Sequence, residues 1–294
     1  MNIKIKTPVF ARSERAAAVK LSEIVQISES VQARKAKGED ILSFGTGEPD
    51  FPTPMNIIEA AHSAMLAGQT TYPPTQGIPS LRKAIIEHTA SYPSGKPDKT
   101  EVIVCTGAKQ VLSNAFLATL NQGDEVIVPA PYWTSYADIV AFCQANLVPV
   151  ACTGETNFKL SPAQLSAAIT SKTKWLLLNS PGNPSGALYS SQELSALADV
   201  LRANPHVWIL ADEIYQHISY DTFTSFREIA PDLLARMLIV NGVSKAYAMT
   251  GWRLGWGIGP RELIDTMVGV QGQSTSGACS ISQAAAIAAL TGPQ

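Results

Sequence analysis

From residue 100 onwards, short apolar runs alternate with longer stretches in which apolar residues recur at helical spacing. This alternation is typical of strands and covering helices, so we predict an α/β protein with a mostly parallel seven-stranded sheet. The predicted strands are Val102–Cys105, Glu125–Val128, Leu147–Ala151, Trp175–Leu178, Val207–Ala211, Met237–Val240 and Leu254–Ile258. The predicted helices between them are Gln110–Leu120, Ser135–Gln144, Pro162–Ile169 and Gln192–Ala203.

The first hundred residues follow a different pattern. Residues 13–37 are polar, charged and helical in spacing, and two further helices are predicted over Asn56–Gly68 and about Ser80–Ala90. The segments "GTGEPDFPTP" (45–54) and "TYPPTQGIP" (71–79) contain too much proline to be helical. Both are therefore predicted to be ordered, extended loops.

Composition narrows the class of protein. A chain of 294 residues with a formal net charge of -2 and a pI near 6.1 lacks the basic character of a nucleic-acid-binding protein. No apolar run approaches the ~20 residues of a membrane span. Cys105, Cys143, Cys152 and Cys279 lie far apart, which predicts free thiols in a reducing, cytoplasmic compartment. Neither the cysteines nor the four histidines show metal-ligand spacing, so no metal is predicted.

The residues after each predicted strand are candidates for a site, because ligands of open α/β sheets bind at the carboxyl ends of the strands. After the first strand, Gly107, Ala108 and Lys109 open a helix. Backbone N–H groups there can hold a phosphate, although an ordinary strand-to-helix turn has the same sequence pattern. After the second strand, "PAPYWTSY" brings Trp133 and Tyr136 to the same edge, either to stack on a flat ligand or to fill the core.

The next strand ends add polar groups. "NSPGNPSG" places Asn179 and Asn183 in a loop fixed by proline, where they can donate to a ligand oxygen or stabilise the turn. Asp212 ends a buried strand, where a carboxylate needs a partner such as a protonated ring nitrogen. Tyr215 follows three residues later, close enough for its hydroxyl to reach the same ligand.

Lys245 follows the next strand beside a bend, with Arg253 eight residues further on. A lysine in this place is either solvated or a reagent. Together, the strand ends supply phosphate donors, a stacking ring, an amide, a carboxylate and an amine. Pyridoxal 5′-phosphate (PLP) uses all of them, because it carries a phosphate, a flat ring, a phenolic oxygen, a pyridinium nitrogen and an aldehyde.

These motifs give the chain a close resemblance to a known family. "GTGEPDFPTP", "YPPTQGIPSLRKAI", "TGAKQ", "PAPYWTSY", "NSPGNPSG", "ADEIY" and "SKAYAMTGWRLGWGIGP" resemble the class I and II, fold-type I PLP-dependent aminotransferases, most closely bacterial aspartate and prephenate aminotransferases. The resemblance covers residues from about 28 to 294. It implies the aspartate aminotransferase-like fold, with an N-terminal arm at 1–45 that contributes to a small domain and a large PLP-binding domain at 46–294.

The resemblance implies a role for each matched residue around PLP. Lys245 would form a Schiff base with the cofactor and later act as acid and base, while Asp212 would pair with the pyridine nitrogen. Tyr215 and Asn183 would contact the phenolic oxygen, and Trp133 would stack over the ring. The residues implied at the phosphate are Gly107, Ala108, Lys109, Ser244, Arg253 and, from the neighbouring subunit of a homodimer, Tyr72.

The resemblance also implies a substrate site for an amino acid and a 2-oxo acid. The substrate would be dicarboxylic, such as aspartate or glutamate, because an ammonium and two hydroxyls suit a second carboxylate. A solvated lysine and a helix-capping serine remain simpler explanations for two of these groups. The implied residues are Gly47, Trp133 and Asn183 near the substrate, with Lys109, Ser28 and Ser30 against its distal carboxylate.

Two features depart from the family pattern. Gly242 stands three residues before Lys245, where the family often carries a Ser or Thr that donates to the phosphate. The sequence also stops at "AALTGPQ", before the segments that build most of the small domain and carry an Arg for the substrate α-carboxylate. The C-terminal small domain is therefore expected to be absent.

The sequence thus predicts an aminotransferase that acts through Lys245. Other reactions of the same cofactor and fold, such as those of a C–S lyase or a decarboxylase, stay open, because the residues that hold PLP are shared. An inactive, truncated remnant is a further alternative. A PLP-binding sensor would need an added DNA-binding module, for which the short N-terminal lead leaves little room.

Overall fold

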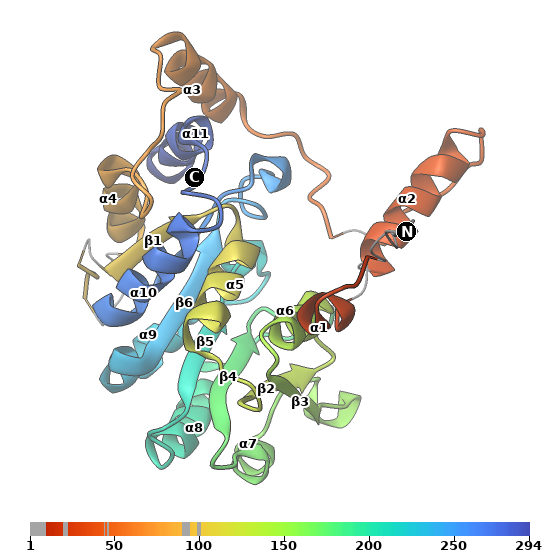
Figure 1. Ribbon diagram of the computed structural model, residues 1–294, viewed down its shortest axis with the longest axis vertical. Helices are drawn as coiled ribbons and strands as arrows, with labels where there is room; N and C mark the ends of the chain where they lie inside the picture. The colour runs from red at the N-terminus through yellow and green to blue at the C-terminus, as the bar shows by residue number, and fades with distance from the viewer. Residues whose placement is uncertain (1–9, 20–22, 44, 46, 90–94, 99–100) are drawn as a thin grey trace, which may run out of the picture.

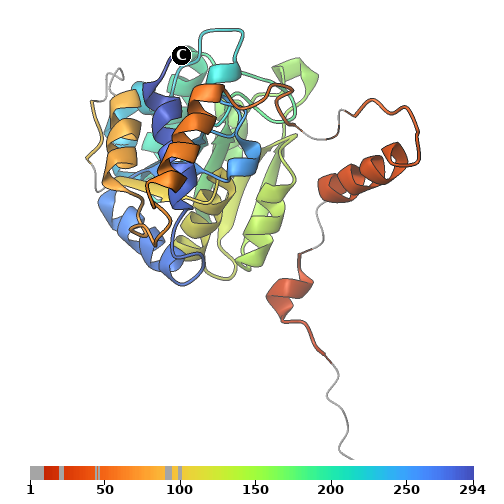
Figure 2. The same cartoon turned by 90° about the horizontal axis from the view of Figure 1, so that it is seen from above.

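The computed structural model describes residues 10–19, 23–43, 45, 47–89, 95–98 and 101–294. Within these residues, one seven-stranded sheet forms the centre of the molecule and helices lie on both of its faces (Figure 1, Figure 2). The order across the sheet is β1-β7-β6-β5-β4-β2-β3. The strands are β1 (Val102–Cys105), β2 (Glu125–Ala130), β3 (Asn146–Ala151), β4 (Thr173–Asn179), β5 (Trp208–Asp212), β6 (Met237–Gly242) and β7 (Gly255–Ile258).

The sheet is mostly parallel, as predicted, and β7 is the exception. The pairs β2–β3, β2–β4, β4–β5 and β5–β6 are parallel, whereas β7 is antiparallel to both of its neighbours, β1 and β6. The carboxyl ends of β1, β4, β5 and β6 therefore meet at one edge of the sheet. Because β7 runs the opposite way, it begins at that same edge.

The four helices predicted after residue 100 agree closely with α5, α6, α7 and α8, but the pattern did not single out α9, α10 and α11. α11 is rich in alanine and is covered by α3 and α4. Its sequence therefore lacks the alternation of apolar and polar faces by which a surface helix can be predicted. Residues 13–37, expected to be helical, contain α1 and α2, and residues 20–22 lie outside the described ranges. The helices are α1 (Glu14–Ala17), α2 (Glu23–Lys35), α3 (Met55–Leu66), α4 (Pro79–His88), α5 (Ala108–Thr119), α6 (Ser135–Phe142), α7 (Pro162–Ala168), α8 (Ser191–Arg202), α9 (Phe226–Ile229), α10 (Arg261–Gly272) and α11 (Ser280–Thr291).

The sheet separates two hydrophobic cores. Alternate residues of a strand point to opposite faces, so β4 gives Trp175 and Leu177 to one core and Leu176 and Leu178 to the other. Burial on both faces explains why this strand is a continuous apolar run in the sequence. Helices α5, α6 and α10 complete the first core, and α3, α4, α7, α8, α9 and α11 complete the second.

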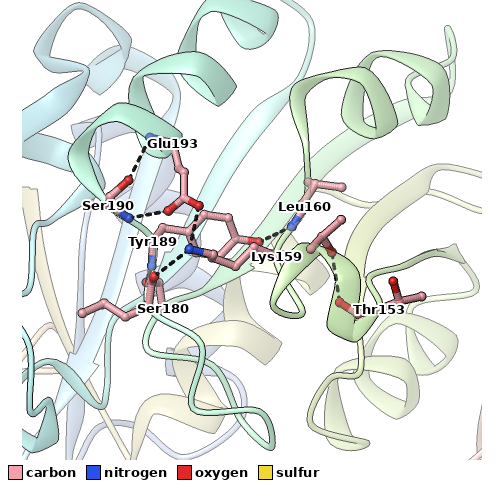
Figure 3. Close-up of polar contacts among 9 residues, drawn as sticks. Thr153, Lys159, Leu160, Ser180, Tyr189, Ser190 and Glu193 are labelled. Atoms are coloured by element: carbon pink, nitrogen blue, oxygen red, sulfur yellow. Dashed lines mark hydrogen bonds and ion pairs between the residues drawn. The ribbon is translucent and has the colours of Figure 1, made fainter.

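The loop between β4 and α8 is anchored by polar contacts (Figure 3). The hydroxyl of Tyr189 accepts a 2.6 Å hydrogen bond from the backbone N–H of Leu160, and Lys159 forms a 2.6 Å ion pair with Glu193. Glu193 and Ser190 cap the start of α8 reciprocally, which satisfies backbone donors that the helix leaves unpaired. These contacts hold the end of the loop that leads from Asn183 into α8.

The N-terminal segment lies to one side of the sheet. In both views α2 stands away from the strands and their covering helices, while α1 approaches α6 (Figure 1, Figure 2). The division into an arm at 1–45 and a large domain at 46–294 stays a prediction. None of the helices in the described ranges is long and apolar enough to cross a membrane. All four cysteines carry free thiols.

A buried amide ties the loop that follows Tyr72 to the sheet. The side chain of Gln271 on α10 is fully buried, and its Nε2 donates to the carbonyl oxygens of Thr75 at 2.6 Å and Val104 at 2.8 Å. Its Oε1 accepts from Nδ2 of Asn114 on α5 at 2.9 Å. One side chain thus joins α10, α5, β1 and the proline-rich loop.

We predict that Gln271→Ala lowers the free energy of unfolding by about 2–4 kcal/mol, because it leaves buried donors and acceptors unpaired. The measurement is urea unfolding, with Gln273→Ala as the control. Gln273 is exposed at the end of the same helix, so its replacement should change stability by no more than about 0.5 kcal/mol. Equal effects of the two substitutions would contradict the structural role of the Gln271 amide.

Candidate active site

A cavity of about 620 Å³ opens at the carboxyl ends of β4, β5 and β6. Its size falls within the range of small-molecule sites, and its wall combines backbone, aromatic and charged groups. Most of the residues predicted from the strand ends meet here. The lining residues are Gly45, Gly47, Ala108, Lys109, Leu112, Trp133, Tyr136, Asn183, Pro184, Asp212, Ile214, Tyr215, Ser244, Lys245, Thr250 and Arg253.

One end of the cavity is built to hold an anion. Helix α5 starts here after Gly107, and no side chain caps it, so its first backbone N–H groups are available to a ligand. Gly107 has φ +82, and a Cβ at this position would lie 2.5 Å from Nη2 of Arg253. Only glycine lets the guanidinium approach this turn. Arg253 is held in place because its Nη1 donates to the carbonyl oxygen of Thr250 at 2.6 Å.

A buried carboxylate lines the same cavity as the start of α5. Asp212, the last residue of β5, is 3% exposed, and its Oδ2 accepts a 2.7 Å hydrogen bond from the hydroxyl of Tyr136. Its Oδ1 accepts from the backbone N–H of Ile214 at 3.3 Å. Burial raises the pKa of Asp212 to about 6, and the two hydrogen bonds oppose that shift. No ion pair in the described part of the chain includes Asp212, so the site favours a ligand with a positive charge.

Asn183 and Tyr215 form a pair of donors on the cavity wall. Nδ2 of Asn183 lies 3.1 Å from the hydroxyl of Tyr215, and both side chains line the cavity. Asn179, the other asparagine that the sequence singled out, serves the backbone instead. Its Nδ2 donates to the carbonyl oxygen of Asp212 at 2.9 Å, and its Oδ1 accepts from the N–H of Asn183 at 2.8 Å.

Lys245 extends into the cavity from the loop after β6. Its Nζ donates to the carbonyl oxygen of Gly47 and lies 5.9 Å from the ring centroid of Tyr215. Burial lowers the pKa of Lys245, the cation of Arg253 adds to this shift, and Glu48 opposes it. The neutral amine, which is the nucleophilic and basic form, is therefore more accessible than in a solvated lysine.

Trp133 presents its ring to the cavity between two neighbours. Nζ of Lys109 lies 4.6 Å from the ring centroid, and Tyr136 meets the ring edge-on with centroids 5.4 Å apart. Burial lowers the pKa of Lys109, the nearby cation of Arg253 adds to the shift, and Asp138 opposes it. An ammonium thus lies at the rim beside a flat aromatic face.

Three predicted site residues lie elsewhere in this chain. Tyr72 is 95% exposed, and Ser28 and Ser30 are on α2, outside the cavity lining. Their predicted contacts stay predictions. The sequence reasoning missed Thr250, whose hydroxyl donates to Glu48 beside Lys245. Thr250 stands three residues before Arg253 in "TGWR", and this motif was the available signal.

Gly242 has a steric explanation for its departure from the family pattern. A Cβ at this position would lie 2.9 Å from the carbonyl oxygen of Leu254 and 3.0 Å from Cα of Gly255. Strands β6 and β7 therefore approach too closely for the Ser or Thr that the family often carries there. Ser244, Arg253 and the start of α5 remain at the cavity to hold an anion.

The comparisons identify the class of enzyme that this fold and site belong to. The family model for aminotransferase class I and II matches residues 39–294, and the chain belongs to this family of enzymes. An aspartate aminotransferase of Rhizobium meliloti is 48% identical over 296 residues, which are 100% of this chain and 72% of that protein. An aspartate/prephenate aminotransferase of Cereibacter sphaeroides is 50% identical over 284 residues, 96% of this chain and 71% of that protein.

Solved structures show the same fold. The aspartate aminotransferase from Rhizobium meliloti matches with a TM-score of 0.93 and 48% identity, covering 97% of this chain and 72% of that one. The aspartate aminotransferase from Thermus thermophilus with maleate matches with a TM-score of 0.92 and 40% identity, covering 96% and 73%. The predicted aspartate aminotransferase-like fold is thereby confirmed.

Because Asp212 is buried and has no ion-pair partner in the described part of the chain, we predict a pH-dependent gain in stability for Asp212→Asn in the cofactor-free protein. A carboxyl whose pKa is raised on folding binds its proton more tightly in the folded state, so its ionisation destabilises the fold above about pH 6 but not below about pH 4. A shift of about two pKa units corresponds to ~3 kcal/mol. The variant should therefore exceed the wild type by up to ~3 kcal/mol at pH 8.

Urea unfolding between pH 4 and pH 8 measures this difference, which should shrink as the pH falls from 6 to 4. Asp265→Asn is the control, because Asp265 is an exposed carboxylate on α10. A difference between Asp212→Asn and the wild type that is the same at every pH would mean that burial does not raise the pKa of this carboxyl.

Proposed function

We propose that this protein is a PLP-dependent aminotransferase that moves an amino group between a dicarboxylic amino acid and a 2-oxo acid. The observation that carries the proposal is the shared cavity of Lys245 and Asp212. Three groups line this one cavity. They are the amine of Lys245 with its lowered pKa, the buried Asp212 carboxylate without a described ion-pair partner, and the anion site at the start of α5. This donor set fits the aldehyde, the pyridinium nitrogen and the phosphate of PLP.

The residues that would hold PLP are those that surround this cavity. Arg253, Ser244 and the backbone at Gly107–Lys109 suit the phosphate, and Trp133 suits the face of the ring. Asn183 and Tyr215 can donate to the phenolic oxygen, and Asp212 can accept from the ring nitrogen. When bound, PLP supplies an electron sink that stabilises the electron pair left on the amino-acid Cα when one of its bonds breaks.

Lys245 would have two tasks in this chemistry. Its Nζ would bind the cofactor through the aldehyde carbon and, once displaced by the substrate amine, would move a proton at the substrate Cα. The lowered pKa suits both tasks, because a neutral amine is needed to attack and to accept a proton. The carbonyl oxygen of Gly47, which accepts from Nζ, keeps the amine at the mouth of the cavity.

A dicarboxylic substrate is supported by the cations around the cavity. Lys109 places an ammonium at the rim beside Trp133, where it can pair with a second carboxylate. The names of the relatives, aspartate and aspartate/prephenate aminotransferase, agree with this choice. Ser28 and Ser30 remain part of the proposal through their resemblance to family residues alone.

We also propose a homodimer. The ring of Tyr72 is 95% exposed and lies outside the cavity lining of its own chain. Phe51, Met55 and Leu66, which precede Tyr72 in the loop before α3 and on α3, expose 74%, 64% and 77% of their surfaces. Apolar exposure of this kind marks a surface that another chain covers, and a two-fold partner would bring its Tyr72 to this cavity. The free thiols support a cytoplasmic location.

Lys245→Ala tests the central assignment. After incubation with PLP and reduction with borohydride, the wild type should carry the cofactor on the peptide that contains Lys245. The variant should lose that label and should transfer amino groups from aspartate to 2-oxoglutarate at least ~10²-fold more slowly. Lys172→Ala, an exposed lysine, is the control and should change neither readout.

Label on another lysine would overturn the role of Lys245. The reaction products separate the alternatives. Transfer gives a new amino acid, a C–S lyase gives free ammonia and a thiol, and a decarboxylase gives carbon dioxide. A wild-type protein that binds PLP but forms no new amino acid from aspartate and 2-oxoglutarate would contradict an aminotransferase.

Lys109→Met tests the substrate. If the ammonium pairs with the distal carboxylate, kcat/KM for aspartate should fall by an amount equivalent to ~1.5–3 kcal/mol, while kcat/KM for phenylalanine should stay within about twofold. Methionine is also unbranched and only one atom shorter than lysine, so it keeps most of the side chain without its charge. Equal losses on both amino acids would show that Lys109 serves only the cofactor.

A further inference from the structure

Within the described part of the chain, the one side chain that donates a hydrogen bond to the Asp212 carboxylate is Tyr136. Its hydroxyl lies 2.7 Å from Oδ2, and the other contact of the carboxylate is the longer one, 3.3 Å from the backbone N–H of Ile214. Tyr136 is 2% exposed and Asp212 is 3% exposed, so both groups are largely shielded from bulk solvent. A hydrogen bond to a charged acceptor in a dry environment is among the stronger ones in proteins.

The position of Tyr136 is itself fixed by the fold. It lies in the first turn of α6, where its N–H donates to the carbonyl oxygen of Trp133 at 3.0 Å. Its ring meets the ring of Trp133 edge-on, with the planes at 87°. One rigid side chain therefore contacts both the carboxylate and the aromatic wall of the cavity.

We propose that Tyr136 is a positioning residue for the proposed aminotransferase, which fixes the rotation of the Asp212 carboxylate and keeps it ionised for a protonated ring nitrogen. The inference rests on the proposed function, but the coupling between the two side chains can be measured without the cofactor. Loss of the hydroxyl should leave Asp212 in place and make its proton harder to remove.

The groups around Asp212 support this assignment. Tyr215 and Glu213 face it from the segment after β5, and Lys245 and Arg253 lie across the same cavity. Of these, none makes a hydrogen bond to the Asp212 carboxylate in the described part of the chain. Burial raises the pKa of Tyr136 well above its ordinary value, and the nearby charge of Asp212 adds to this shift. The phenol therefore stays protonated, and able to donate, throughout the range from pH 4 to 8.5.

Tyr189→Phe provides a matched control. Tyr189 is a second buried phenol, 3% exposed, and its hydroxyl accepts from the N–H of Leu160 instead of contacting Asp212 (Figure 3). Both substitutions remove one buried hydroxyl and keep the ring. Any effect that follows only from lost packing or a lost hydrogen bond should appear in both variants.

The experiment measures two quantities for the wild type, Tyr136→Phe and Tyr189→Phe, each with and without Asp212→Asn. The first is the free energy of unfolding of the cofactor-free protein from pH 4 to 8. The second is the dissociation constant for PLP from pH 5.5 to 8.5, by equilibrium dialysis. Comparison with the Asp212→Asn background isolates the part of each Tyr→Phe effect that depends on the Asp212 carboxylate.

Tyr136→Phe should move the pH at which Asp212 ionises upward by about one unit or more, seen as a shift in the pH dependence of the stability difference. If the pKa of Asp212 rises from about 6 to about 7, the affinity for PLP should fall about eightfold at pH 5.5 and about threefold at pH 6.5, and should be almost unchanged at pH 8.5. Tyr189→Phe should leave both pH profiles unchanged. In the Asp212→Asn background, Tyr136→Phe should have no pH-dependent effect.

The same decrease in affinity at every pH, or a shift that persists without the carboxylate, would overturn the role of Tyr136. An upward shift in the ionisation of Asp212 without any change in the pH profile of PLP binding would also overturn it. Failure of the proposed function appears differently, as a wild-type protein that shows no saturable binding of PLP at any pH.

Discussion

The buried carboxylate of Asp212 is the constraint on which the site depends. It ends a central strand, is 3% exposed and has no cation of the described chain as a partner, although a charge in such a place costs several kcal/mol. Two hydrogen bonds recover part of that cost. The rest of this cost appears as a raised pKa of the Asp212 carboxyl, and a cationic group of a ligand at the cavity would offset it. Ionised Asp212 therefore lowers the stability of the fold at the position where the proposed ligand would bind.

The order and direction of the strands bring the other groups to this carboxylate. β5 lies between β4 and β6, so the loops that carry Asn183 and Lys245 flank Asp212 on either side. The anion site requires the antiparallel strand. Cys105 at the end of β1 pairs with Gly255 at the start of β7, which places the turn at Gly107 beside Arg253. A parallel β7 would carry Arg253 to the opposite edge of the sheet.

The sequence predicted what is local and missed what depends on the placement of distant segments. Continuous apolar runs gave the strands, and because parallel neighbours end at one edge, Asp212 and Lys245 could be brought together without coordinates. Tyr136 stayed ambiguous between core and site because its ring packs in the core while its hydroxyl reaches Asp212. Ser28 and Ser30 could be placed on a helix, but helical spacing carries no information on where that helix lies relative to the sheet.

The charges around the cavity determine how binding and proton uptake are linked. The cation of Arg253 contributes to lowering the pKa of both Lys109 and Lys245. An anionic group bound against Arg253 offsets this repulsion, so it raises the pKa of a lysine that stays free and favours the charged form of that lysine. Lys109 feels this change directly. Through electrostatics alone, an anion at the helix start would thus favour the ammonium form of Lys109, the form that the proposed pairing with a substrate carboxylate needs.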